Sequence, residues 1–131
     1  MRAYVAITPS ELQTFLSDGS LVVAQALIVE PETLHGTQVD EAEQEELEFE
    51  TSWNAALISR ERQGSGQSLG LVLAVDLEEE QVGKIEGDHV DLRSKLLWTQ
   101  VQSLLVSDSE EPELSWFAPQ EIATYLPKWL A

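Results

Sequence analysis

The stretch DEAEQEELEFETSWNAALIS, from Asp40 to Ser59, decides the fold because it predicts one long helix with an acidic beginning. Seven carboxylates occur in its first eleven residues, and its second half carries apolar residues at helical spacing. The positive end of the helix dipole offsets part of the repulsion among these acids, and Arg60 and Arg62 suit the opposite end. The sequence therefore predicts a helix from about Val39 to Arg62.

Apolar side chains occur on two sides of this predicted helix. One stripe at 3.6-residue spacing contains Val39, Ala42, Phe49, Trp53, Ala56 and Leu57. The other side carries Leu47, Ala55 and Ile58. Such two-sided apolarity predicts that the helix is buried between layers or contacts another subunit.

Short apolar runs in the rest of the chain predict the strands of a sheet. The most apolar run, Leu71 to Val75, indicates a central buried strand. Four other segments are expected to form strands: residues 2–7, 21–30, 82–92 in one or two pieces joined through Gly87, and 114–117. Residues 101–106 also favour a strand after a short turn, although the leucine spacing from 94 to 107 is compatible with a helix.

Two shorter helices complete the predicted domain. Thr8, Pro9 and Glu11 form the pattern of a capping box with proline at the first helical position, and Gly19 is a natural stop. A closing helix is expected over residues 119–126. We therefore predict a single α+β domain over residues 1–131, in which a mixed sheet of about four or five strands is covered by one long acidic helix and two shorter ones.

Charge limits the classes of partner. The 24 acidic and 7 basic residues give a net charge of -17, which repels phosphate backbones and anionic headgroups, so we expect neither a nucleic acid nor a membrane partner. The absence of cysteine excludes thiol catalysis and disulfides, and we expect neither a signal sequence nor a membrane-spanning segment. The sequence predicts a cytoplasmic protein with a possible basic protein partner.

A G-x-S-x-G motif around Ser68 is the strongest enzyme-like pattern, because Asp76 and His89 follow in the order of α/β-hydrolase triads. That chemistry requires the serine on a turn from a strand into a helix. Here the motif follows a predicted helix and precedes a predicted strand. The residues therefore favour a plain glycine- and serine-rich loop, and we predict no catalytic residues.

Carboxylates on the acidic helix suggest a metal site only weakly. Glu43, Glu46 and Glu50 share one helix face, but no histidine stands at the spacing that carboxylate-bridged metal bundles use. The polar group of Asp88, His89 and Asp91 is more typical of an exposed turn. We expect no metal and no cofactor.

Neighbouring aromatics near the end of the chain suggest an interaction surface. Trp116 and Phe117 are adjacent on a predicted strand and must face opposite ways, so one is expected in the core and the other at the surface. The candidate interaction surface comprises Glu43, Glu46, Glu50, Leu47, Ile58, Trp116 and Phe117. The leading hypothesis is an interaction or regulatory module without catalysis. The alternatives are a small enzyme, acting through Ser68 or through helix carboxylates with a metal, and a homodimer joined through Leu47, Ala55 and Ile58.

Three segments carry a family resemblance: the opening MRAYV followed by a Thr-Pro helix, EELEF at residues 45–49, and LSWFAPQEI at residues 114–122. They resemble an uncharacterised actinobacterial domain-of-unknown-function family with an MRVYL opening, an EELEY helix and a closing LLWYATQEI. The resemblance favours a strand at residues 101–106 and implies no activity. Where the family tends to carry His-Val-Asp, this chain has Leu105, Val106, Ser107 and Asp108.

Overall fold

The computed structural model describes residues 1–30, 41–64 and 68–131. The helices in this part of the chain are α1 (Pro9–Asp18), α3 (Glu41–Gln63) and α4 (Pro119–Leu130), with 3-10 turns at Glu79–Gln81 and Trp98–Gln100. The strands are β1 (Arg2–Ile7), β2 (Ser20–Leu21), β3 (Gln25–Leu27), β4 (Gly70–Asp76), β5 (Val82–Glu86), β6 (His89–Leu92), β7 (Leu96–Leu97), β8 (Val101–Ser107) and β9 (Ser115–Phe117).

The main sheet is larger than the sequence predicted. It has seven strands in the order β5-β6-β3-β1-β4-β8-β9, and every neighbouring pair is antiparallel, so the prediction of a mixed sheet of four or five strands was wrong. Strands β2 and β7 form a separate small ladder. The α+β class is confirmed, and the described residues contain one long and two short α-helices, as predicted.

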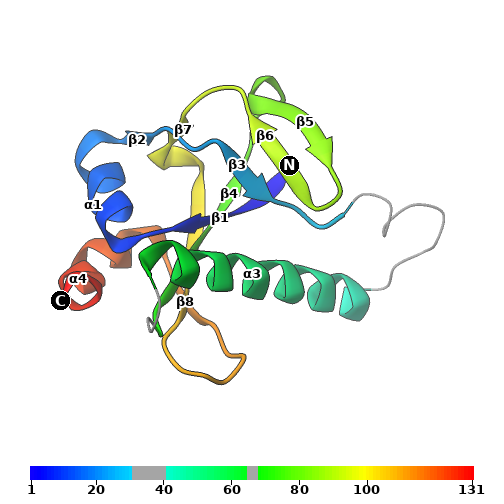
Figure 1. Ribbon diagram of the computed structural model, residues 1–131. Helices are drawn as coiled ribbons and strands as arrows, with labels where there is room; N and C mark the ends of the chain where they lie inside the picture. Colours follow the sequence, from blue (N-terminus) through cyan, green and yellow to red (C-terminus); the bar gives the residue numbers. More distant parts are fainter. Residues whose placement is uncertain (31–40, 65–67) are drawn as a thin grey trace.

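Helices cover both faces of the sheet (Figure 1). On one face, α1 and α4 pack over the larger cluster of buried residues, which includes Phe15, Leu73 and Ile122. On the other face, α3 packs over a smaller cluster that includes Tyr4 and Val72. Successive side chains of β1 and of β4 belong alternately to the two clusters, because side chains along a strand point to opposite faces in turn.

The central strand was predicted correctly. Strand β4 lies between β1 and β8, and its residues from Gly70 to Val75 are all buried. The hairpin of β5 and β6 turns through Gly87, which has φ of 62°, as expected for glycine in a tight turn. The strand alternative for residues 101–106 is also confirmed, because β8 begins directly after a 3-10 turn.

The predicted strand over residues 21–30 is broken. Val22 is 83% exposed and lies between β2, which pairs with β7, and β3, which pairs with β1 and β6. Within the second piece, Ala26 and Leu27 belong to the clusters on opposite faces of the sheet. The nearly continuous apolar run therefore forms two short strands, which belong to two different sheets, and not one long strand.

The first helix has the predicted ends. The backbone N–H of Glu11 donates to the Thr8 hydroxyl at 3.2 Å, and the Glu11 carboxylate accepts from the Thr8 N–H at 3.0 Å, which completes the capping box. Gly19 ends the helix in the left-handed conformation with φ of 74°.

Helix α3 turns its small residues, and not its large apolar ones, toward the sheet. The buried positions are Thr51, Ser52, Ala55, Ala56 and Ser59. Of the apolar stripe that the sequence picked out, Ala56 is buried, whereas Phe49 and Leu57 are exposed. Small side chains let the helix approach closely, and a Cβ at Gly70 would lie 2.5 Å from the Ala56 carbonyl oxygen. Val39 and Asp40, which the sequence placed in this helix, lie outside the described residues.

Candidate interaction face

One flank of α3 carries large side chains that the sheet leaves exposed. Phe49 and Leu57 are 40% and 43% exposed, and Trp53, which is half-buried, stands four residues from each. Four-residue steps place these three side chains along one flank of the helix. Glu46 and Glu50 precede Trp53 and Leu57 at compatible spacing, so carboxylates line the same outer surface.

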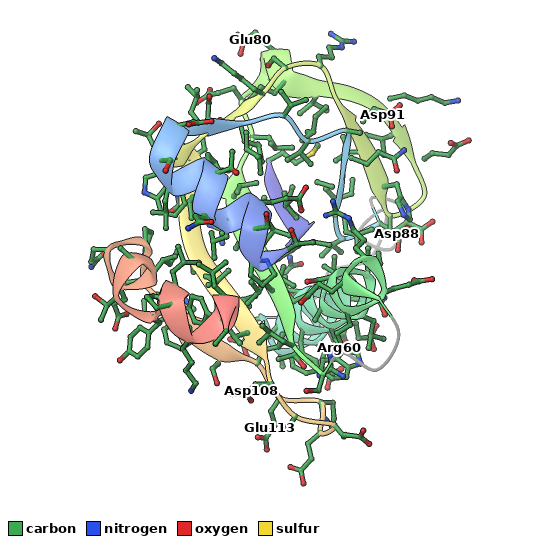
Figure 2. All side chains as sticks on the ribbon, turned by 60° about the vertical axis from the view of Figure 1, so that its left-hand side comes forward. Arg60, Glu80, Asp88, Asp91, Asp108 and Glu113 are labelled. Atoms are coloured by element: carbon green, nitrogen blue, oxygen red, sulfur yellow. The ribbon has the colours of Figure 1, made fainter. Side chains whose placement is uncertain are left out.

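Arg60 fixes this flank over strand β8. Its guanidinium lies 5.5 Å from the centre of the Trp53 ring, and it donates to the Ser107 hydroxyl and, at 2.6 Å, to the Ser109 carbonyl oxygen. Figure 2 shows Arg60 beside the loop that carries Asp108 and Glu113. The guanidinium therefore links the helix to the end of β8 and the beginning of the following loop.

Strand β9 continues the same surface at the edge of the sheet. Trp116 is 62% exposed and pairs across from Leu105 of β8, whose side chain packs against the cluster beneath α3. Residues directly opposite in a ladder point to the same face, so Trp116 lies on the α3 side of the sheet. We call Phe49, Trp53, Leu57 and Trp116 with the adjoining carboxylates the α3/β9 face.

Carboxylates border the α3/β9 face from two segments. Six of the ten residues from Glu41 to Glu50 are glutamates, and four of the six residues from Asp108 to Glu113 are acidic. Neither segment contains a lysine or an arginine. The nearest cation on the helix flank, Arg60, already interacts with Trp53, Ser107 and Ser109. The field at this face is therefore negative, and it favours a cationic partner.

The predicted interaction residues divide among three places. Glu43, Glu46 and Glu50 are exposed on α3, and Trp116 is exposed at the edge of the sheet, on the same side of the sheet as α3. Leu47 and Ile58 are half-buried, and Ile58 packs against the cluster that contains Tyr4 and lines a cleft on the far flank of the helix. A homodimer joined through Leu47, Ala55 and Ile58 is not supported, because Ala55 is fully buried against the sheet.

Phe117 lies on the opposite face of the sheet. Its ring centre is 5.0 Å from that of Tyr125 and 5.2 Å from that of Trp129, both on α4. The prediction that Trp116 and Phe117 face opposite ways is confirmed, and Phe117 belongs to the packing beneath α4. Phe117 is therefore not part of the candidate interaction surface.

The hydrolase-like residues are not assembled. Ser68 precedes β4, whereas Asp76 ends β4 and pairs with Arg2 at 2.8 Å. The seven residues of β4 separate them by about 20 Å at the usual rise of a strand. His89 lies on β6 and contacts Asp88 at 2.6 Å, so it is not a partner for Ser68. Gly66 and Gln67 of the motif lie outside the described residues.

Acidic residues form no metal cage in the described part of the chain. No group of three or more histidine, aspartate and glutamate side chains is placed to hold an ion there. Asp91 is occupied instead by a hydrogen bond from the Gln25 amide at 2.9 Å. Figure 2 shows Asp88 and Asp91 on the side of the molecule away from the loop with Glu113.

A cleft of about 370 Å³ lies on the other flank of α3. Arg62 crosses one end of it, donating to the Ala6 carbonyl oxygen at 2.9 Å and to the Glu11 carboxylate at 2.8 Å. Burial tends to raise the pKa of Glu11, but hydrogen bonds from Arg62 and the Thr8 backbone outweigh it and leave the pKa below its usual value. The pair thus fastens the end of α3 to the beginning of α1.

The chain matches the model of a family of unknown function, DUF6912, over residues 1–112. The chain belongs to this family. Membership in DUF6912 confirms the expectation of an uncharacterised domain family, although the closing segment at residues 114–122 lies beyond the matched region. Comparisons with curated proteins and with solved structures gave no match. Among the described residues of this DUF6912 chain, no helix has the length and apolar character needed to cross a membrane.

Sequence reasoning missed the residue that organises the face. Arg60 was assigned only to the helix dipole, yet it links Trp53 on α3 to β8. The signal was present in the seven-residue spacing of Trp53 and Arg60, which is two helical turns and places both on one flank. Its contact with Ser107 depends on the tertiary fold and had no local signal.

Proposed function

We propose that this chain is a protein-binding module without catalysis, and that its α3/β9 face recognises a basic segment of a partner protein. The observation that carries the proposal is the exposed Trp116 on the α3 side of the sheet, together with two segments rich in carboxylates, one on α3 and one directly before β9. Exposed aromatics at the centre of a charged rim are typical of binding hot spots.

Energetics favour this face over a purely electrostatic surface. An isolated surface ion pair contributes about 0–1 kcal/mol, so acids alone give weak and unspecific attraction. A partly exposed tryptophan adds apolar area that binding can bury, at about 25 cal/mol per Å². Lysine and arginine provide both the ion pair and the apolar contact, because their aliphatic stems pack on an aromatic ring while their charged groups reach carboxylates.

Binding of a fluorescent lysine-rich peptide, followed by anisotropy at low and moderate salt, tests the proposal. The double variant Glu46→Lys/Glu50→Lys should weaken binding by about tenfold, since reversing two charges removes attraction and adds repulsion. Trp116→Ala should also weaken binding, by about tenfold.

The matched control is Glu79→Lys/Glu80→Lys. It changes the net charge equally at exposed positions in a 3-10 turn at another part of the molecule, where Figure 2 shows Glu80 far from Glu113. We expect this variant to weaken binding by about twofold or less, because solvent and salt screen distant charges. Equal losses for the two double variants would show that only the overall charge matters, and the α3/β9 face would be rejected.

A further inference from the structure

Strand β9 presents a free edge of the sheet. It is the last strand in the order and pairs with β8, and within the described part of the chain no backbone hydrogen bond from outside the ladder reaches its outer side. Every residue of a strand has a backbone donor and acceptor, and those pointing away from β8 are available to a further strand.

The other edge of the sheet is protected against such pairing. Strand β5 carries a register shift between Val82 and Ile85, and it bears Lys84 and Glu86, which are exposed and 3.8 Å apart. Bulges and charged side chains are the usual means by which proteins block strand addition. Strand β9 has neither, since its sequence is Ser115, Trp116 and Phe117 and its pairing with β8 is regular.

We propose that a basic segment in extended conformation adds to the edge of β9 as an eighth strand of the main sheet. This inference rests on the proposed function and specifies how the partner binds. Main-chain hydrogen bonds to a sheet edge give affinity, and alternate side chains give specificity. Because β9 is only three residues long, side-chain contacts at Trp116 must add to the few main-chain bonds.

The two faces of the sheet set the sequence that such a segment requires. A residue opposite Trp116 lies about 4.5–5.5 Å from it between Cβ atoms, next to the strand that directly follows the acidic loop from Asp108 to Glu113, so lysine or arginine fits there. On the other side lies Phe117, packed with Tyr125, which is 41% exposed. An apolar side chain fits there. The segment should therefore alternate basic and apolar residues.

A second copy of the same chain fits this edge poorly. Each copy carries a net charge of -17, and the acidic loop from Asp108 to Glu113 precedes β9 by a single residue. Pairing two such edges would bring two strongly negative molecules into contact, and their repulsion would oppose association. The charge at the edge thus selects a basic segment of another protein.

Two isomeric peptides test the strand geometry. Lys-Val-Lys-Val-Lys-Val-Lys has the required alternation, and Lys-Lys-Val-Val-Val-Lys-Lys has the same composition and charge without it. We expect the alternating peptide to bind about tenfold more tightly, and to protect from hydrogen exchange those backbone amides of Ser115 to Phe117 that point away from β8. Its binding should fall by about tenfold with Trp116→Ala and hardly change with the control Val22→Ala, which alters an exposed residue outside the face.

Backbone methylation separates this inference from the proposed function. One version of the alternating peptide carries N-methyl groups on its even amides and another on its odd amides, and only one set points toward β9. One version should lose about tenfold in affinity and the other should bind nearly as the parent does. If both bind as the parent does, strand addition is wrong while recognition of a basic segment stands. If neither isomer binds at any salt concentration, the proposed function fails as well.

Discussion

Replacing the fully buried Ser59 with alanine should destabilise the fold without changing its shape. The Ser59 hydroxyl donates to the Ile7 carbonyl oxygen at 2.7 Å and accepts from the Leu71 N–H at 2.9 Å. Ile7 and Leu71 are paired residues of β1 and β4, so this hydroxyl fastens α3 to both central strands. Alanine leaves one carbonyl and one N–H buried without this partner.

Each of these two buried groups costs about 1–3 kcal/mol when it loses its hydrogen bond, so Ser59→Ala should lower the free energy of unfolding by about 2–6 kcal/mol. That is a large fraction of the roughly 5–15 kcal/mol typical of a domain. Urea unfolding followed by tryptophan fluorescence measures it. At a slope of about 2 kcal/mol per molar urea, the midpoint should fall by roughly 1–3 M.

Ser52→Ala is the matched control. Ser52 is also buried on α3, but its hydroxyl donates to the Glu48 carbonyl oxygen within the helix at 2.8 Å, and its contact with β1 is to the Tyr4 side chain rather than to a backbone group of the strand. That carbonyl is one turn back and retains its helical partner, and alanine favours the helix, so the change should be within about 1 kcal/mol of zero. Similar losses for the two variants would refute the reasoning, because they would show that the contacts to β1 and β4 contribute nothing particular.

Two further changes test the packing and the electrostatics of α3. Gly70→Ala should lower the free energy of unfolding by about 1–3 kcal/mol in the same urea assay. The new Cβ would lie 2.5 Å from the Ala56 carbonyl oxygen and would push α3 away from β4. An unchanged midpoint would contradict this close approach. Glu11→Gln should cost about 0.5–1 kcal/mol near neutral pH by weakening the contact with Arg62. Because the folded-state pKa of Glu11 lies below its ordinary value of 4.5, this stabilisation is present above about pH 4.5 and is lost as the pH falls through the folded-state pKa. The stabilities of the two proteins should therefore converge in acid, and a constant difference would exclude the carboxylate as the cause.

Elements with a strong local signal were predictable from the sequence. The capping box at Thr8 and Glu11, the stop at Gly19 and the apolar run of β4 each specify structure through neighbouring residues, and each is confirmed. The opposite orientation of Trp116 and Phe117 follows from strand geometry alone. It too is confirmed.

The number of strands and their pairing were not predictable in the same way. Strands β3 and β9 have three residues each, too few to show a period, and their pairing depends on partners far along the chain. The buried side of α3 was misjudged for a different reason. Apolar periodicity selects Phe49 and Leu57, whereas the sheet accepts small residues that permit close packing against Gly70.

Helix α3 therefore separates stability from recognition on its two sides. Its inner side holds Ser59 against β1 and β4, whereas Trp116 is exposed on β9 and shares no hydrogen-bond partner with Ser59 among the described residues. Effects at sites that share no partners are expected to add. Ser59→Ala should thus lower the urea midpoint and leave the affinity for the alternating peptide within about twofold, measured where the variant is fully folded. Trp116→Ala should lower the affinity for the alternating peptide and leave the urea midpoint nearly unchanged. The double variant should show the full loss of stability and the full loss of affinity. A loss of affinity in folded Ser59→Ala as large as that in Trp116→Ala would mean that recognition depends on the seating of α3, and that the two sides of the helix act as one unit.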